Sequence, residues 1–155
     1  MKKLTFLVAA LCATMAVNAV DQTSTFVDKD WNVGSGELTW TKTGAAATSF
    51  ETANDARGVQ TMLTNIKSDG LTLSCTGVTE RVTAVAIVLS ANGADGSIES
   101  VKVGETAFMC GEDASYSIAS GTKNKSVKFE GSASGTIVIK FASTATSKSL
   151  YVKSI

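Results

Sequence analysis

The chain contains no histidine and no proline among its 155 residues. Without histidine, neither a Ser-His-Asp nor a Cys-His catalytic arrangement can form, and the commonest general base of enzymes is missing. Zinc sites that combine cysteine with histidine are excluded for the same reason. Without proline, the sequence also lacks one of the residues that block the edge of a β-sheet against pairing with another chain.

Acidic residues are present, but few of them lie close together. Paired carboxylates can carry out glycoside hydrolysis, whereas most acids here stand alone on predicted turns: Glu51, Asp55, Glu80, Glu99 and Glu105. Glu112 and Asp113 are adjacent, and adjacent residues of a strand point to opposite faces. We therefore expect a protein that is not an enzyme and needs no cofactor or metal, with an unrecognised hydrolase as the catalytic alternative.

Neither sign of charge dominates the sequence, which has 14 basic and 14 acidic residues. The basic residues are scattered, apart from Lys123, Lys125 and Lys128 near one turn. A nucleic-acid-binding domain usually carries a clustered basic face. The sequence therefore predicts no nucleic-acid partner.

The first nineteen residues have the pattern of a secretory signal peptide. Lys2 and Lys3 precede an uncharged apolar run from Leu4 to Val17, and Ala19 completes a small-residue cleavage site. The run is shorter than the roughly 20 residues that a membrane-spanning helix needs. We expect residues 1–19 to be removed and residues 20–155 to be exported to the periplasm, the cell surface or the medium, with no membrane span after cleavage.

Two cysteines, Cys75 and Cys110, follow the predicted leader. Export permits a disulfide, and both residues fall in the inward phase of predicted strands. A bridge would close a loop of about 36 residues and restrict the unfolded chain by roughly 3.5 to 4 kcal/mol. The alternative is a pair of buried free thiols, which pack like small hydrophobic residues.

Short runs of alternating apolar and polar residues dominate the chain after the leader, and this alternation is typical of β-strands. It is found in residues 37–42, 71–76, 98–103, 116–118, 127–129, 137–141 and 150–152. Residues 82–90 are apolar at almost every position, which predicts a central strand covered on both faces. In the region from 43 to 68, residues 45–47 and 57–67 predict either a short helix or a loosely paired edge.

Glycine-rich turns separate these runs, and Asp69-Gly70 and Asn92-Gly93 are candidates for hairpin turns. Strands every eight to twelve residues joined by such turns indicate a sandwich or barrel. The sequence has neither a fixed repeat nor a change of composition that would mark a linker. We predict one all-β domain, an antiparallel two-sheet β-sandwich with about nine or ten strands.

Several segments resemble the small jelly-roll modules of secreted proteins from gut Bacteroidetes. These segments are a Trp- and Gly-rich opening at residues 31–40 and strand-and-turn patterns at 100–104, 135–139 and 149–155. The resemblance implies a two-sheet jelly roll similar to carbohydrate-binding modules, and it carries no family site residues. Such modules usually continue past the final Ile, so the last strand here is expected to be either short or at a sheet edge.

The two tryptophans are the most informative side chains for function. Trp40 shares its phase with Leu38 and is expected in the core. Trp31 lies in a polar, Gly-rich segment, where an exposed indole offers a flat apolar face for stacking on a sugar ring. We predict a ligand site formed by Trp31 with hydrogen bonds from Asp28, Asp30 and Asn32.

Two other interpretations of the polar segments remain open. Asp28-Lys29-Asp30 and Asn92-Gly93-Ala94-Asp95-Gly96 place oxygen ligands at alternating positions, as calcium prefers, although plain turns explain both. The expected function is a secreted, non-catalytic module that binds a polysaccharide or other glycan. The alternative is a structural or adhesive domain that contacts another protein through its sheet edges.

Overall fold

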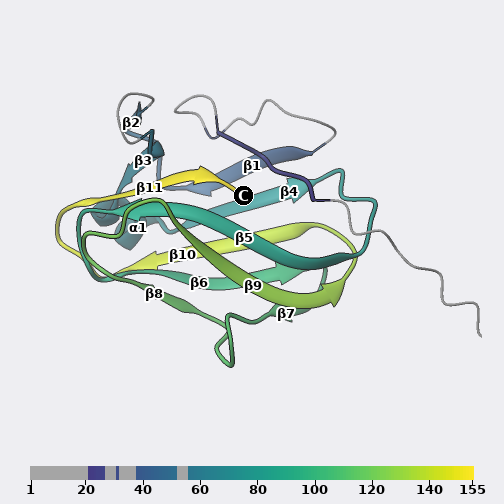
Figure 1. Ribbon diagram of the computed structural model, residues 1–155. Helices are drawn as coiled ribbons and strands as arrows, with labels where there is room; N and C mark the ends of the chain where they lie inside the picture. The colour runs from purple at the N-terminus through teal and green to yellow at the C-terminus, as the bar shows by residue number, and fades with distance from the viewer. Residues whose placement is uncertain (1–20, 27–30, 32–37, 52–55) are drawn as a thin grey trace, which may run out of the picture.

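The computed structural model describes residues 21–26, 31, 38–51 and 56–155 (Figure 1). Two antiparallel sheets and one short helix make up the described part of the chain. The elements are β1 (Thr39–Gly44), β2 (Ser49–Glu51), β3 (Gly58–Met62), α1 (Leu63–Asp69), β4 (Leu71–Thr76), β5 (Val82–Ala91), β6 (Gly96–Val103), β7 (Thr106–Phe108), β8 (Tyr116–Ile118), β9 (Lys125–Ala133), β10 (Ile137–Ser143) and β11 (Ser149–Ser154).

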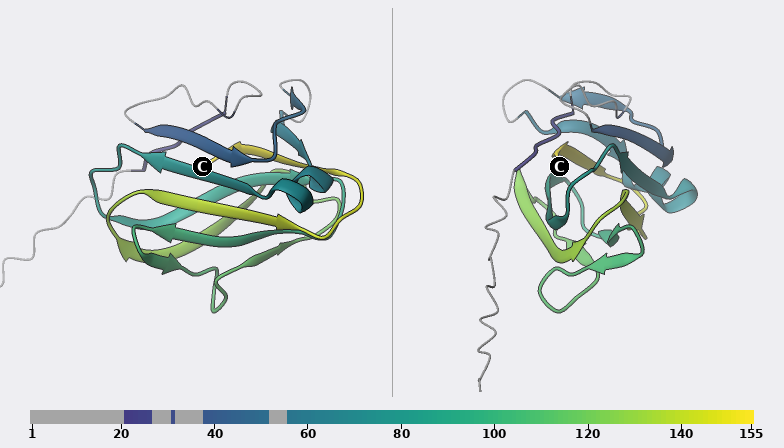
Figure 2. Two further views of the ribbon diagram at one scale, coloured as in Figure 1. Left: turned by 180° about the vertical axis from the view of Figure 1, so that it is seen from behind. Right: turned by 90° about the vertical axis from the view of Figure 1, so that its right-hand side faces the viewer.

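The two sheets have different strand orders. The six-stranded sheet runs β1-β4-β10-β6-β7, with β8 also paired to β6, and the five-stranded sheet runs β2-β3-β11-β5-β9. Figures 1 and 2 show the sheets stacked face to face, with α1 at one end. The predicted all-β, two-sheet antiparallel sandwich is confirmed.

Four sets of strand pairs are nested along the chain. β6 pairs with β7 and β8, which follow it directly; outside them β5 pairs with β9, β4 with β10, and β3 with β11. The chain thus forms one long antiparallel hairpin, rolled so that β3, β4, β5 and β6 alternate between the two sheets. This strand order is that of a jelly roll.

Alternation along each strand builds the core between the sheets. Inward-facing side chains such as Leu73, Ile87 and Ile139 have no exposed surface, while their strand neighbours are half-buried or exposed. Aromatic residues close one part of this core, where Phe26 packs edge-on against Trp31 and Trp40 with ring centroids 5.6 and 6.4 Å apart. The prediction that Trp40 belongs to the core is confirmed, since 4 % of it is exposed.

Several local predictions were wrong in their details. Residues 82–90 were expected to be covered on both faces, but the outer face of β5 is open to solvent. Ala86 is exposed there and Val88 is half-buried. Neither of the two candidate hairpin turns joins paired strands. Gly70 ends α1, and Asn92-Gly93 connects β5 and β6, which belong to different sheets. The region from 43 to 68 contains both predicted alternatives, the edge strand β2 and most of the short helix α1. The last strand, β11, lies between β3 and β5 and is not at an edge.

The two cysteines are free thiols in this structure, so, of the two alternatives that the sequence left open, the disulfide is not formed. Cys75 lies on β4, and Cys110 follows β7, three strands further across the same sheet. Neighbouring strands are about 4.8 Å apart, so roughly 14 Å separates the two positions across the sheet. A disulfide needs Cα atoms within about 7 Å of each other.

The edges of the sheets are short, joined or carry a charge. β7 continues into a bridge between Met109 and Glu130 of β9, which links the two sheets along one side. On the other side β2 has three residues, and on β1 the Lys42 ammonium donates a hydrogen bond to the Gly44 carbonyl (2.9 Å). Such devices oppose pairing with another chain.

Among the described residues, no helix has the length and apolar character required to cross a membrane.

Candidate functional site

Of the four residues that the sequence assigns to a ligand site, the structure describes one. Asp28, Asp30 and Asn32 lie outside the described residues. Trp31 is 1 % exposed and packs edge-on against Phe26. The indole of Trp31 is therefore buried in this structure and not exposed on a loop, while its role in binding a sugar stays a prediction. A large aromatic side chain gains more from burial than its polar sequence surroundings suggest.

A small hollow of about 70 Å³ lies beside the other tryptophan, Trp40. Ser24 and Trp40 line it, and neither the Ser24 hydroxyl nor the Trp40 indole N–H has a hydrogen-bond partner among the described residues. This hollow can hold water, and it is far smaller than the roughly 300 Å³ at which small-molecule pockets begin.

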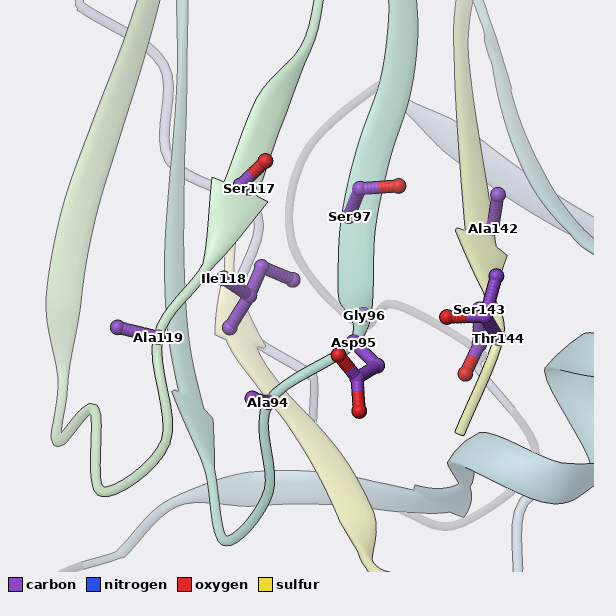
Figure 3. A pocket seen from close by; sticks show the side chains of 10 residues that line it. All are labelled: Ala94, Asp95, Gly96, Ser97, Ser117, Ile118, Ala119, Ala142, Ser143 and Thr144. Atoms are coloured by element: carbon purple, nitrogen blue, oxygen red, sulfur yellow. The ribbon is translucent and has the colours of Figure 1, made fainter. Parts of the chain in front are cut away.

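A larger depression of about 480 Å³ lies on the six-stranded sheet, at the end of the sandwich where α1 is found (Figure 3). Binding pockets for small molecules usually have volumes of about 300 to 1,000 Å³. The residues that line the depression are Ala94, Asp95, Gly96, Ser97, Ser117, Ile118, Ala119, Ala142, Ser143 and Thr144.

Three strands bring these residues together. In one row across the sheet, Ala142 of β10 lies beside Ser97 of β6, and Ser97 lies beside Ser117 of β8. The next row consists of Ser143, Gly96 and Ile118. Eight of the ten lining residues are Ala, Gly, Ser or Thr. The hollow thus exists because small side chains occupy adjacent positions on neighbouring strands.

The inner side of this part of the sheet is filled from α1. A side chain at Gly96 would place its Cβ 2.9 Å from a methyl group of Leu63. Leu63 has no exposed surface and is the first residue of α1. A side chain at Gly96 would therefore require Leu63 to shift, and the depression has a packed floor.

Asp95 closes the depression at the beginning of β6. Its φ angle is +69°, a left-handed conformation that Asp and Asn adopt more readily than other non-glycine residues. The Thr144 amide donates a hydrogen bond to the Asp95 carbonyl (2.9 Å), which joins the turn to the end of β10. Figure 3 shows the Asp95 carboxylate between the ends of β8 and β10, on the side of the Ser143 and Thr144 hydroxyls.

The polar groups of the depression are almost unused within the protein. The side chains of Asp95, Ser97, Ser117 and Thr144 make no hydrogen bond or ion pair with any other residue that the structure describes, whereas Ser143 Oγ accepts one from the Ala145 amide (3.0 Å). One carboxylate and four hydroxyls therefore face the hollow, and four of these five groups are available to a ligand.

The sequence contained a partial signal for this site. The turn at residues 92–96 was considered for its oxygen ligands, and Asp95 belongs to it. No group of three or more carboxylate, thiol or imidazole ligands is found among the described residues. The serines and alanines of the site gave no signal, since outward-facing small residues are common on strands and only the strand order brings these together.

Comparison with protein-family models, with curated proteins and with solved structures finds no match to this chain.

Proposed function

We propose that the chain is an exported, non-catalytic module that binds a glycan in the depression between β8, β6 and β10. One observation carries this proposal: a carboxylate and four hydroxyls converge on a hollow of about 480 Å³, and most of them have no partner among the described residues. Polar groups that gather around a concave surface without satisfying one another can be satisfied by a ligand.

The chemistry of the lining suits a sugar. Each serine or threonine hydroxyl both donates and accepts hydrogen bonds, and the carboxylate accepts them, so the lining complements the hydroxyl groups of a pyranose. Ala94 and Ala142 add apolar contact for the C–H face of the ring. No aromatic residue lines the depression, so hydrogen bonds of about 0.5 to 1.5 kcal/mol each would carry the affinity. We expect weak binding, with a dissociation constant of roughly 0.1 to 1 mM.

Export is the part of the proposal that depends on sequence alone. The pattern of residues 1–19 supports secretion, and these residues lie outside the described part of the chain. Mass spectrometry of the protein recovered from its native cells tests it. A mature chain that begins at Val20 supports export, and an intact leader in the cytosol contradicts it.

The proposal is tested by filling the depression. Ala142→Leu places a larger side chain on the outer face of β10 and is expected to abolish retention on glycan arrays. Ala86→Leu is the matched control, because Ala86 faces outward on a strand of the other sheet and is exposed. Both variants should unfold at the same denaturant concentration as the unchanged protein. If no glycan retains the unchanged protein, or if Ala142→Leu binds as well as Ala86→Leu, the proposal fails.

A further inference from the structure

The depression carries a charge of one sign. Asp95 is the one charged residue among the ten that line it, and no lysine or arginine is included. Asp95 is exposed and forms no ion pair with another described residue. The site therefore presents a negative charge that no lining residue neutralises.

The remaining polar groups can all act as acceptors. Hydroxyl oxygens of Ser97, Ser117 and Thr144 have acceptor capacity, and the depression contains no side-chain N–H group. A protonated amine has three donors and no acceptor, which matches a carboxylate surrounded by hydroxyl oxygens. A carboxylate or sulfate group on a ligand would instead face Asp95 as a like charge.

The backbone that carries the carboxylate is held in place. The Thr144 amide donates a hydrogen bond to the Asp95 carbonyl (2.9 Å), and Figure 3 shows the Asp95 side chain between the ends of β8 and β10. From this charge and geometry we infer that the depression recognises a sugar with a free, protonated amino group, such as a hexosamine unit, and this rests on the proposed glycan-binding function.

The expected preference is modest, because Asp95 is exposed to solvent. An exposed charge pair contributes at most about 1 kcal/mol, which corresponds to a roughly fivefold difference in affinity. The amine-bearing sugar should therefore bind about fivefold more tightly than its N-acetylated counterpart, and the preference should decrease with added salt because the pair is screened.

The test compares three oligosaccharides of equal length by NMR titration: a β-1,4 oligomer of glucosamine at a pH where its amines are protonated, the fully N-acetylated oligomer, and a neutral glucose oligomer. Asp95→Asn keeps the shape of the side chain and tolerates the left-handed backbone, so this variant should bind all three oligomers equally. Asp113→Asn is the control, since Asp113 is exposed and lies outside the depression. It should keep the fivefold preference.

The outcomes separate this inference from the proposed function. Equal binding of the three oligomers to the unchanged protein, with binding lost in Ala142→Leu, overturns the amine preference and leaves glycan binding intact. A preference that persists in Asp95→Asn also overturns it, because the attraction would then come from charges elsewhere. If neither these oligomers nor any glycan on an array binds the unchanged protein, the proposed function itself fails.

Discussion

The outer faces of the two sheets have the same pleated geometry and use their polar residues in opposite ways. On the five-stranded sheet, the Arg57 guanidinium lies over the Tyr151 ring, 4.2 Å from its centroid, and donates a hydrogen bond to Asn92 Oδ1 (3.1 Å). Asn92 Nδ2 in turn donates to the Tyr151 hydroxyl (3.3 Å). Three segments that are distant in sequence are thus joined by hydrogen bonds between their side chains.

Gln60, which pairs with Tyr151 in the same row of the five-stranded sheet, extends this arrangement. Gln60 accepts a hydrogen bond from Ser49 and donates one to Ser149 Oγ (2.7 Å). Further along the sheet, Lys128 and Glu130 of β9 form an ion pair (2.6 Å). Long side chains reach their neighbours and cover the strands, so that Tyr151 is 5 % exposed although it faces outward.

The six-stranded sheet has short side chains at the corresponding end. Serine, threonine and alanine side chains from β6, β8 and β10 are too short to cover the strands, and most of their hydroxyls make no hydrogen bond to described residues. A polar outward face is therefore not by itself a binding surface. The two outer faces differ in whether their polar side chains are long enough to form hydrogen bonds with each other. The predictions below test this difference, from the largest expected effect to the smallest.

The largest effect concerns Trp31, which belongs to neither outer face. We expect Trp31→Ala to lower the free energy of unfolding by about 3 to 5 kcal/mol, as truncation of a buried aromatic residue usually does, and Trp31→Phe to cost less. Urea denaturation measures both. Unchanged stability together with lost glycan binding would show instead that Trp31 is exposed and contacts the glycan. The binding site would then lie on neither of the two outer faces.

Tyr151→Phe tests the outer face of the five-stranded sheet, where polar side chains are hydrogen-bonded to one another. The variant removes the hydroxyl that accepts a hydrogen bond from Asn92, and it should lower stability by about 0.5 to 1.5 kcal/mol. Glycan binding should not change, because this network lies on the opposite sheet from the depression. A loss of glycan binding in a folded Tyr151→Phe protein would place the binding site on the five-stranded sheet instead of the six-stranded sheet.

Asp95→Gly tests the depression on the six-stranded sheet, and we expect it to change stability little. Glycine relieves the cost of a left-handed backbone, about 1 kcal/mol, but loses about as much through its more flexible unfolded state. We therefore expect thermal unfolding within a few degrees of the unchanged protein, together with weaker binding of amine-bearing sugars. A strongly destabilised variant would mean that Asp95 has a structural role.

The cysteines should have the smallest effect at neutral pH. Burial raises the pKa of the Cys75 thiol to about 11, so Cys110 should react with a thiol reagent in the folded protein and Cys75 only after unfolding. The folded state retains the Cys75 proton to higher pH than the unfolded state, whose thiol titrates near 9.0. The contribution of Cys75 to stability should thus be constant below pH 9 and decrease between pH 9 and 11, and Cys75→Ala should remove this part of the pH dependence. A disulfide detected without reducing agent would contradict the structure.

Much of the fold was predictable from alternation alone. The segment 71–76 coincides with β4, and 82–90 with all but the last residue of β5. The helix at 63–69 was less clear, because seven residues give barely two turns of periodicity. The covering of β5 was misjudged, since alanine and valine at outward positions look the same in sequence whether or not another layer lies over them.

The candidate site was predicted much less well. The sequence favoured Trp31 because a tryptophan among glycines and polar residues resembles an exposed platform, while its contact with Phe26 exists only in the folded chain. The serines of the depression, Ser97, Ser117 and Ser143, lie on three different strands. No pattern in the local sequence indicates that these strands are neighbours. Asp95 alone stood out, through the composition of its turn.

The amino-acid sequence by itself determined the secondary-structure class, because strand alternation and turn residues are encoded within a few neighbouring positions. It also fixed the absence of histidine-dependent chemistry. Only the tertiary structure decided which outward faces are satisfied and which are hollow, that Trp31 is buried, and that Cys75 and Cys110 lie three strands apart. These properties depend on the order and register of strands that are distant along the chain, and that order is set by the packing of the whole core.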